Sequence, residues 1–183
     1  MARMNEMAVL DWIQSMFWSP TMDTVMATLG LKAAGVMILA AVLVPLLIIR
    51  RYRRLAMVIL MAIIILYAVS ELLVKPMIAR PRPFVEDPGI VLLLEPPGGF
   101  SFFSTHTMIS FLGATVVFIR ASWKLGAVFY ILALLISFSR MYLYFHYLSD
   151  VITGAVIGML CAVVICYMLG RYDMGMEERY IRQ

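Results

Sequence analysis

Three short segments of the chain hold both of its histidines, together with a lysine, two arginines and an aspartate. They read Lys75-x6-Arg82-Pro83, Phe103-Ser104-Thr105-His106 and Ser139-Arg140-x5-His146-x3-Asp150. Guanidinium and ammonium groups bind phosphate oxygens, and an imidazole can act as a nucleophile or as a general acid. These residue types at these spacings therefore indicate a phosphoryl-transfer site that needs no metal ion and no cofactor.

The two histidines are predicted to have different catalytic roles. His146 and Asp150 are four residues apart, a spacing that places both side chains on one face of a helical turn. The carboxylate can then accept the Nδ1–H of the imidazole, which leaves Nε2 free to attack phosphorus. The leaving group needs an acid on the far side, and His106 is the other imidazole of the sequence. General acid catalysis of this kind contributes about 10²–10⁴-fold.

The remaining residues of the three segments are predicted to bind the substrate. Lys75, Arg82 and Arg140 would hold phosphate oxygens. Ser104 and Thr105 occur where a new helix is expected to start, a position whose backbone N–H groups attract anions.

Simpler explanations exist for single residues. Glu71 and Lys75 are four apart on one helix and could neutralise each other, and His146 with Asp150 could form a buried structural pair. Arg80 could be a second phosphate ligand or a contact to lipid headgroups, and we favour the contact to headgroups. A charge inside a membrane costs about 2.5–3.5 kcal/mol on insertion scales, so several charges together favour a function.

The composition predicts the helices that must position these residues. The chain of 183 residues is 63% hydrophobic and 14% charged, with a mean hydropathy of +0.94, whereas soluble domains average about 25% charged residues. We predict an all-α polytopic transmembrane bundle that forms a single domain over residues 1–183. Its five spans, each near the length needed to cross about 30 Å of hydrocarbon, are placed at 31–49, 55–74, 105–120, 125–143 and 151–170.

Basic residues predict the topology. Cytoplasmic loops of membrane proteins are enriched in Lys and Arg, and alternating spans place the following residues on one side: Arg50, Arg51, Arg53, Arg54, Arg120, Lys124, Arg171, Arg179 and Arg182. The candidate site then faces the extracytoplasmic side of a multi-pass protein of the cell membrane. Residues 1–6 show no sign of a cleavable signal peptide, and these basic residues are topology determinants and do not indicate nucleic-acid binding.

The segments outside the spans also carry expectations. Residues 1–30 are predicted to be interfacial, with an amphipathic helix at 7–18 that ends at Ser19-Pro20. Residues 76–104 are predicted to form the active-site loop, with 90–94 dipping into the outer leaflet as a short helix.

Small residues of the last span are expected to serve packing. Cys161 and Cys166 are interpreted as apolar packing residues. Gly154-x3-Gly158 is interpreted as a contact with a neighbouring helix of the same chain.

The three segments, in this order and with this internal spacing, resemble the type-2 phosphatidic-acid phosphatase superfamily of integral-membrane lipid phosphatases. The resemblance covers residues 75–150 and continues into 151–154. It implies that His146 is a nucleophile forming a phosphohistidine, that Asp150 orients it, and that His106 acts first as acid and then as base. The second motif of the family is usually Pro-Ser-Gly-His, so Phe103 and Thr105 are departures from it.

From these residues we predict a metal-independent hydrolase that removes a phosphate or pyrophosphate from a membrane lipid. Bacterial members of the family that act on undecaprenyl diphosphate, a lipid of cell-envelope synthesis, often replace the motif glycine too. By this resemblance, Thr105 favours undecaprenyl diphosphate as the substrate. Phosphatidylglycerophosphate, phosphatidic acid or a lipid A phosphate is the alternative substrate, and a lipid phosphotransferase is the alternative reaction. A transporter or membrane scaffold is the alternative outside the enzymes.

Overall fold

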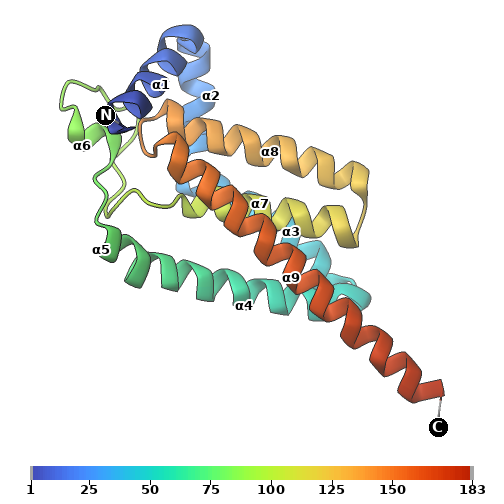
Figure 1. The fold of residues 1–183 in the computed structure, drawn as a ribbon. Helices are drawn as coiled ribbons and strands as arrows, with labels where there is room; N and C mark the ends of the chain where they lie inside the picture. The colour runs from blue at the N-terminus through green and yellow to red at the C-terminus, as the bar shows by residue number, and fades with distance from the viewer. Residues whose placement is uncertain (1, 182–183) are drawn as a thin grey trace.

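The computed structural model describes the backbone of residues 2–181, and their side chains except those of 2–5, 32–36, 38, 51 and 171–181. The described part is helical and contains no strand, which confirms the predicted fold class. The elements are α1 (Ala2–Phe17), α2 (Pro20–Gly30), α3 (Lys32–Ile48), the 3₁₀ turn η1 (Arg50–Tyr52), α4 (Arg53–Val69), the π-helical segment η2 (Ser70–Val74), α5 (Lys75–Ile78), α6 (Pro83–Glu86), α7 (Thr105–Arg120), α8 (Trp123–Tyr142) and α9 (Leu148–Ile181) (Figure 1).

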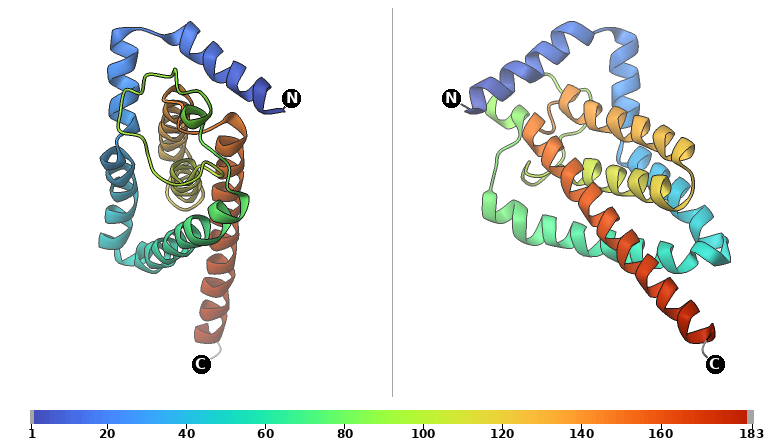
Figure 2. Two further views of the ribbon diagram at one scale, coloured as in Figure 1. Left: turned by 90° about the vertical axis from the view of Figure 1, so that its left-hand side faces the viewer. Right: turned by 45° about the vertical axis from the view of Figure 1, so that its right-hand side comes forward.

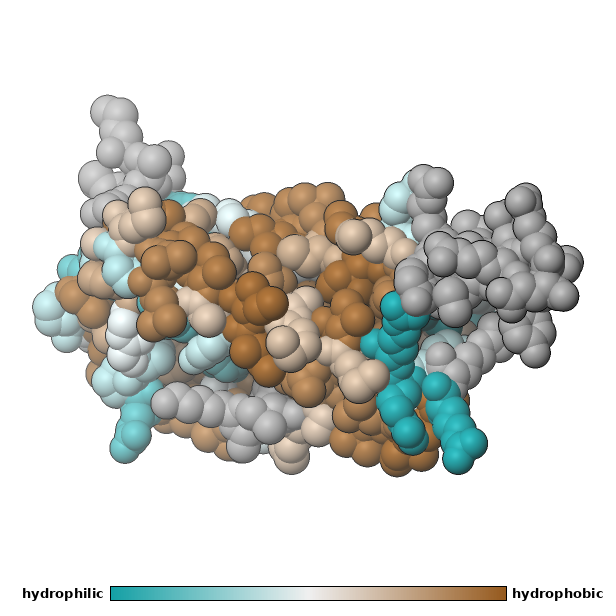
Figure 3. All heavy atoms as spheres, turned by 90° about the horizontal axis from the view of Figure 1, so that it is seen from below, coloured by the Kyte–Doolittle hydropathy of each residue, from teal (hydrophilic) through white to brown (hydrophobic). Residues whose placement is uncertain are grey.

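The predicted spans correspond to α3, α4, α7, α8 and α9. Among the described residues, three helical segments are long and apolar enough to cross a membrane: Arg53–Glu86, Trp123–Tyr142 and Leu148–Gly170. The other two spans contain shorter apolar helices, Leu39–Ile48 and Thr105–Arg120. Figure 3 shows a broad band of hydrophobic side chains across the middle of one face, with hydrophilic residues gathered towards its ends. Such a band suits the hydrocarbon core of a bilayer.

Helix α7 lies at the centre of the bundle and has ten buried residues. It packs against α3, α8 and α9, as the view along the bundle in Figure 2 shows. Leu112 and Val116 are fully buried, and they share one apolar cluster with Val42 of α3 and Ile59 of α4. Cys166 is buried in the same cluster, and both cysteines are free, so they pack as predicted.

Two glycines of α9 allow it to approach α7 closely. A Cβ atom built on Gly154 would lie 2.5 Å from the Ser104 carbonyl oxygen, and one on Gly158 would lie 2.2 Å from the Met108 carbonyl oxygen. Both distances are shorter than van der Waals contact, so only glycine fits. The predicted packing of this glycine pair against a neighbouring helix is confirmed.

The two ends of the bundle differ in character. The α3–α4 turn and the α7–α8 turn lie at one end, and α1, α2, α5 and α6 lie at the other (Figure 1). Of the basic residues that predict the topology, Arg51, Arg171 and Arg179 have side chains outside the described residues, and Arg182 lies outside them entirely.

The N-terminal segment forms two helices joined at Ser19. The Ser19 side chain accepts a hydrogen bond from the Met22 N–H at 3.1 Å, and Pro20 starts α2. This N-cap arrangement explains why α1 ends and α2 begins here. Trp12 and Trp18 are 56% and 63% exposed, as expected of interfacial side chains, whereas Leu10 and Ile13 are buried against the bundle. Helix α1 therefore packs on the bundle with one face and exposes Trp12 on the other.

The predicted short helix at 90–94 is wrong. The long loop forms a single helical turn earlier, at α6, and then runs without helix to Ser104. Ile90, Leu92 and Leu94 pack against the buried cluster that contains Tyr142 and Phe145, whereas Val91 is 89% exposed. This alternation is typical of an extended chain with one side on the protein. The apolar residues of the loop serve packing and not the outer leaflet alone.

Candidate active site

A cavity of about 170 Å³ lies at the end of the bundle where α7 begins. Six of the predicted site residues line it: Lys75, Arg82, Thr105, His106, Arg140 and His146. The other lining residues are Tyr67, Glu71, Pro97, Gly98 and Phe145. The three sequence segments thus meet around one space, with both imidazoles and three cations on its wall. Ser104 and Asp150 lie behind this wall.

A second cavity of about 430 Å³ adjoins the first. The two share Pro97, His106, Arg140 and Phe145. Its other walls are mostly apolar and come from Gly30 and Leu31, at the end of α2, and from residues 94–96 of the loop. A group bound at the two histidines can therefore extend into a larger, more apolar space.

His146 is buried in the short segment 143–147 that precedes α9. Its Nε2 lies 3.3 Å from Nη1 of Arg82, and its Nδ1 lies 3.7 Å from Oδ2 of Asp150. The latter distance is too long for the direct hydrogen bond that the spacing predicts. Burial lowers the pKa of His146 to about 4, which outweighs the opposite effect of the carboxylate. The imidazole is therefore neutral at neutral pH, as a nucleophile must be.

Ser101 connects His146 with Asp150. The buried hydroxyl donates to Asp150 Oδ2 at 2.5 Å, and its oxygen lies 3.4 Å from Nδ1 of His146. A hydroxyl that donates to the carboxylate can also accept the Nδ1–H of the imidazole. Asp150 therefore orients the His146 ring indirectly, through the Ser101 hydroxyl. Sequence analysis missed this residue because it belongs to none of the three motifs. Its one signal is its place just before the second motif.

We expect Ser101→Ala to lower kcat about 10- to 100-fold, because losing the bridging hydrogen bonds costs about 1–3 kcal/mol. KM should change little, since Ser101 does not line the cavity. Phosphate release from a lipid phosphate measures both constants. Ser122→Ala is the matched control, because Ser122 is an exposed serine at the far turn. An unchanged kcat in Ser101→Ala would mean that the serine does not orient His146.

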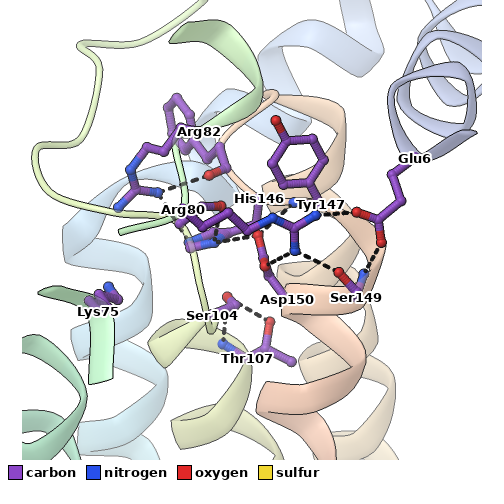
Figure 4. Close-up of polar contacts among 12 residues, drawn as sticks. Glu6, Lys75, Arg80, Arg82, Ser104, Thr107, His146, Tyr147, Ser149 and Asp150 are labelled. Atoms are coloured by element: carbon purple, nitrogen blue, oxygen red, sulfur yellow. Dashed lines mark hydrogen bonds and ion pairs between the residues drawn. The ribbon is translucent and has the colours of Figure 1, made fainter. Parts of the chain in front are cut away.

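Arg82 joins the loop to the segment that carries His146. Its guanidinium donates to the carbonyl oxygens of Gly98 and Gly99, both at 3.1 Å, and to that of Phe145 at 2.8 Å. Figure 4 shows Arg82 beside His146. A planar guanidinium can make these bonds while one edge stays on the cavity wall. Arg82 therefore fixes the loop path as well as facing the cavity.

Arg140 is held by the end of α2. Nη1 donates to the Gly30 carbonyl at 3.0 Å, and Nη2 lies 3.4 Å from the Leu29 carbonyl. The side chain is buried, and its Nε–H has no hydrogen-bond partner within the described part of the chain. A buried donor without a partner lowers the stability of the fold, and such donors occur at sites where a ligand supplies the missing acceptor.

Lys75 and Glu71 form the ion pair that their spacing predicts, at 2.5 Å between Nζ and Oε1. Lys75 is 4% exposed and both residues line the cavity. Glu71 lies in the π-helical segment η2, a deviation that often occurs at functional sites. Lys75 is therefore both paired with Glu71 and placed on the cavity wall, so the ion pair does not exclude a role at the site.

Ser104 and Thr105 differ in position although they are adjacent. Ser104 is the N-cap of α7, and its hydroxyl accepts a hydrogen bond from the Thr107 hydroxyl at 3.0 Å and lies 3.4 Å from the Thr107 N–H. Thr105 starts the helix and its side chain lines the cavity. The start of α7 is also tied to α9, because the Ser104 N–H donates to the Asp150 carbonyl at 3.1 Å.

Arg80 does not face lipid headgroups, so its interpretation as a headgroup contact is wrong. Its side chain is 12% exposed and pairs with Asp150 and Glu6. The left-handed conformation of Ala79, at φ 48°, ends α5 and turns the chain before Arg80. Arg80 is not among the residues that line the cavity.

The described residues contain no group of three or more His, Cys, Asp or Glu side chains that could hold a metal ion. An apolar helical bundle of this kind defines an integral membrane protein, and its cavity at one end is cationic and contains both histidines. Residues 55–173 match the PAP2 superfamily, and the chain belongs to this family. The resemblance seen in the three motifs is thereby confirmed, and members of this family are phosphatases.

Solved structures show the same fold. LpxE of Aquifex aeolicus is 24% identical, with a TM-score of 0.74 over 88% of this chain and 94% of that one. The first transmembrane PAP2-type phosphatidylglycerolphosphate phosphatase from Bacillus subtilis is 19% identical, with a TM-score of 0.70 over 93% of this chain and 87% of that one. Among curated proteins, no sequence matches this chain significantly.

Proposed function

We propose that this protein is a lipid phosphatase that hydrolyses a phosphate or pyrophosphate from a membrane lipid through a phosphohistidine. The observation that carries the proposal is the shared cavity, where His106 and His146 meet Lys75, Arg82 and Arg140. The three cations supply the positive charge that a bound phosphate needs, without a metal ion. The free Nε–H of Arg140 can donate to one of its oxygens.

The reaction has two steps. Nε2 of His146 forms a bond to phosphorus while the bond from phosphorus to the leaving oxygen breaks, and His106 gives its proton to that oxygen. Water then attacks the phosphohistidine, His106 takes a proton from it, and the P–N bond breaks. Inorganic phosphate leaves and His146 returns to its neutral form. Ser101 and Asp150 stabilise the charge that develops on the imidazole.

The first candidate substrate is undecaprenyl diphosphate, which Thr105 in place of the motif glycine favours. The second cavity supports an amphiphile, since its mostly apolar walls suit the part of a lipid beyond the phosphate. Phosphatidylglycerophosphate is the second candidate, because the similar protein from Bacillus subtilis is a phosphatidylglycerolphosphate phosphatase. We further propose that the site faces the extracytoplasmic side of the cell membrane, which the basic turns at the opposite end of the bundle support.

Purified protein in lipid vesicles should release phosphate in the presence of EDTA, and vanadate should inhibit it, because vanadate mimics five-coordinate phosphorus. The panel to assay is undecaprenyl diphosphate, phosphatidylglycerophosphate, phosphatidic acid and a lipid A phosphate. A phosphatase releases inorganic phosphate, whereas a phosphotransferase would need a lipid acceptor. Turnover that EDTA abolishes would contradict the metal-independent mechanism, and ion flux without phosphate release would favour a transporter.

A further inference from the structure

A buried cluster of charges joins the N-terminal helix α1 to the carboxylate behind His146. Nη1 of Arg80 lies 2.6 Å from Oδ1 of Asp150 and 2.7 Å from the Ser149 hydroxyl. Its Nη2 pairs with Oε2 of Glu6. Figure 4 shows the guanidinium lying between Glu6 on one side and Asp150 with Ser149 on the other.

Further contacts fix the plane and position of this guanidinium. Its central carbon lies over the Tyr147 ring, 4.0 Å from the ring centroid. The other carboxylate oxygen of Glu6 accepts from the Ser149 N–H at 3.3 Å. A planar fork that donates to two carboxylates and rests on an aromatic ring has little freedom, and a lysine cannot reproduce its geometry.

The two oxygens of Asp150 have separate tasks. Oδ1 pairs with Arg80, whereas Oδ2 accepts from the Ser101 hydroxyl at 2.5 Å and from the Tyr147 N–H at 2.9 Å. Ser101 in turn contacts His146. Arg80 thus holds one oxygen of the carboxylate while Ser101 and the Tyr147 N–H hold the other, and the carboxylate in turn holds the Ser101 hydroxyl beside the imidazole.

We propose that Arg80 is a positioning residue for the reaction, and that Glu6 holds it from α1, so that the docked N-terminal helix is part of the working site. This inference rests on the proposed phosphohistidine mechanism. Glu6 lies outside the matched family region, which starts at residue 55. Without Glu6, Nη2 loses its carboxylate partner and the guanidinium can turn away from Asp150.

The same helix offers a control for docking alone. The Tyr144 hydroxyl donates to Oδ1 of Asp11 at 2.9 Å, which also joins α1 to the segment that carries His146. The hydrogen bond of Asp11 goes to Tyr144 and not to Asp150, Ser101 or Arg80. Asp11→Asn therefore weakens the attachment of α1 without touching the positioning chain.

The test uses the full chain in lipid vesicles and measures phosphate release as separate kcat and KM values. Losing charge-assisted hydrogen bonds at Asp150 should lower kcat about 100-fold in Arg80→Lys and about 10-fold in Glu6→Gln. KM should stay within about threefold in both, because neither residue lines the cavity. Asp11→Asn should keep kcat near that of the unmodified protein.

A double-mutant cycle separates positioning from general destabilisation. If Glu6 acts through Arg80, Glu6→Gln has no further effect on kcat in the Arg80→Lys background. The inference would be overturned if the kcat losses of Glu6→Gln and Arg80→Lys multiply in the double variant. An unchanged kcat in Glu6→Gln, or an equal loss of kcat in Asp11→Asn, would also overturn it. Glu6 is partly exposed at the edge of the cluster, so its variant tests the proposal even if Arg80→Lys does not fold. Activity in His146→Asn would instead overturn the proposed function itself.

Discussion

Replacing His146 with Asn is expected to abolish phosphate release, with a loss of at least about 10⁴-fold in kcat. The amide has no nitrogen lone pair for attack on phosphorus, although its size is similar to that of the ring. His146 is buried, and its Nε2 lies next to Arg82 on the cavity wall, where the proposed attack on phosphorus takes place. The measurement is phosphate release from the best lipid of the panel, together with trapping of a phosphorylated protein.

The contrast with His106→Asn makes this result specific. His106 lines both cavities and would protonate the leaving oxygen, so its loss should cost about 10²–10⁴-fold with a lipid phosphate. With p-nitrophenyl phosphate, whose leaving group departs without a proton, the first step should recover and phosphohistidine should accumulate. His146→Asn should form no phosphoprotein with either substrate. A phosphoprotein in His146→Asn would show that another residue is the nucleophile.

Much of the cavity could be located from the sequence, because its residues lie at the ends of helices. Lys75 lies near the end of the α4–η2–α5 run, His106 one residue into α7, and Arg140 near the end of α8. Alternating spans place these three ends on one side of a bundle, so motif spacing and span lengths suffice to bring the residues together. The helical fold and the family followed from the same patterns, and both are confirmed.

The network behind the cavity could not be predicted in the same way. Ser101 and Asp150 are separated by 49 residues, and Glu6 and Arg80 by 74. No helical or strand period relates such positions, because their meeting depends on the path of a proline-rich loop and on the docking of α1. The helical spacing of His146 and Asp150 is also misleading, because α9 begins only at Leu148 and His146 precedes it.

The N-terminal helices contribute more to the site than an interfacial role implies. The carbonyls at the end of α2 hold Arg140, and Glu6 of α1 holds Arg80. Residues 1–54 precede the region that matches the family, so motif comparison alone leaves these contacts out. Any residue can supply a backbone carbonyl oxygen, so the sequence does not indicate which residues accept hydrogen bonds from Arg140.

Gly154→Ala is expected to reduce both stability and activity, because the added Cβ meets the Ser104 carbonyl oxygen at 2.5 Å. That carbonyl belongs to the backbone at the start of α7, so relief requires α7 and α9 to separate. Overpacking of this kind costs about 1–3 kcal/mol. The same movement shifts His106 relative to His146, and a displacement of about 1 Å can cost about 10²-fold in rate.

Gly113→Ala in α7 is the matched control for this change. A Cβ there would lie 3.7 Å from Cγ2 of Val42, an ordinary contact, and alanine favours a helix by up to about 1 kcal/mol over glycine. Thermal unfolding in detergent and phosphate release should therefore fall together in Gly154→Ala and hold in Gly113→Ala. If Gly154→Ala unfolds at a lower temperature but keeps full kcat, the close contact of α9 with Ser104 serves stability alone. The separation of the two histidines is then set by the loop residues around Arg82 and Ser101.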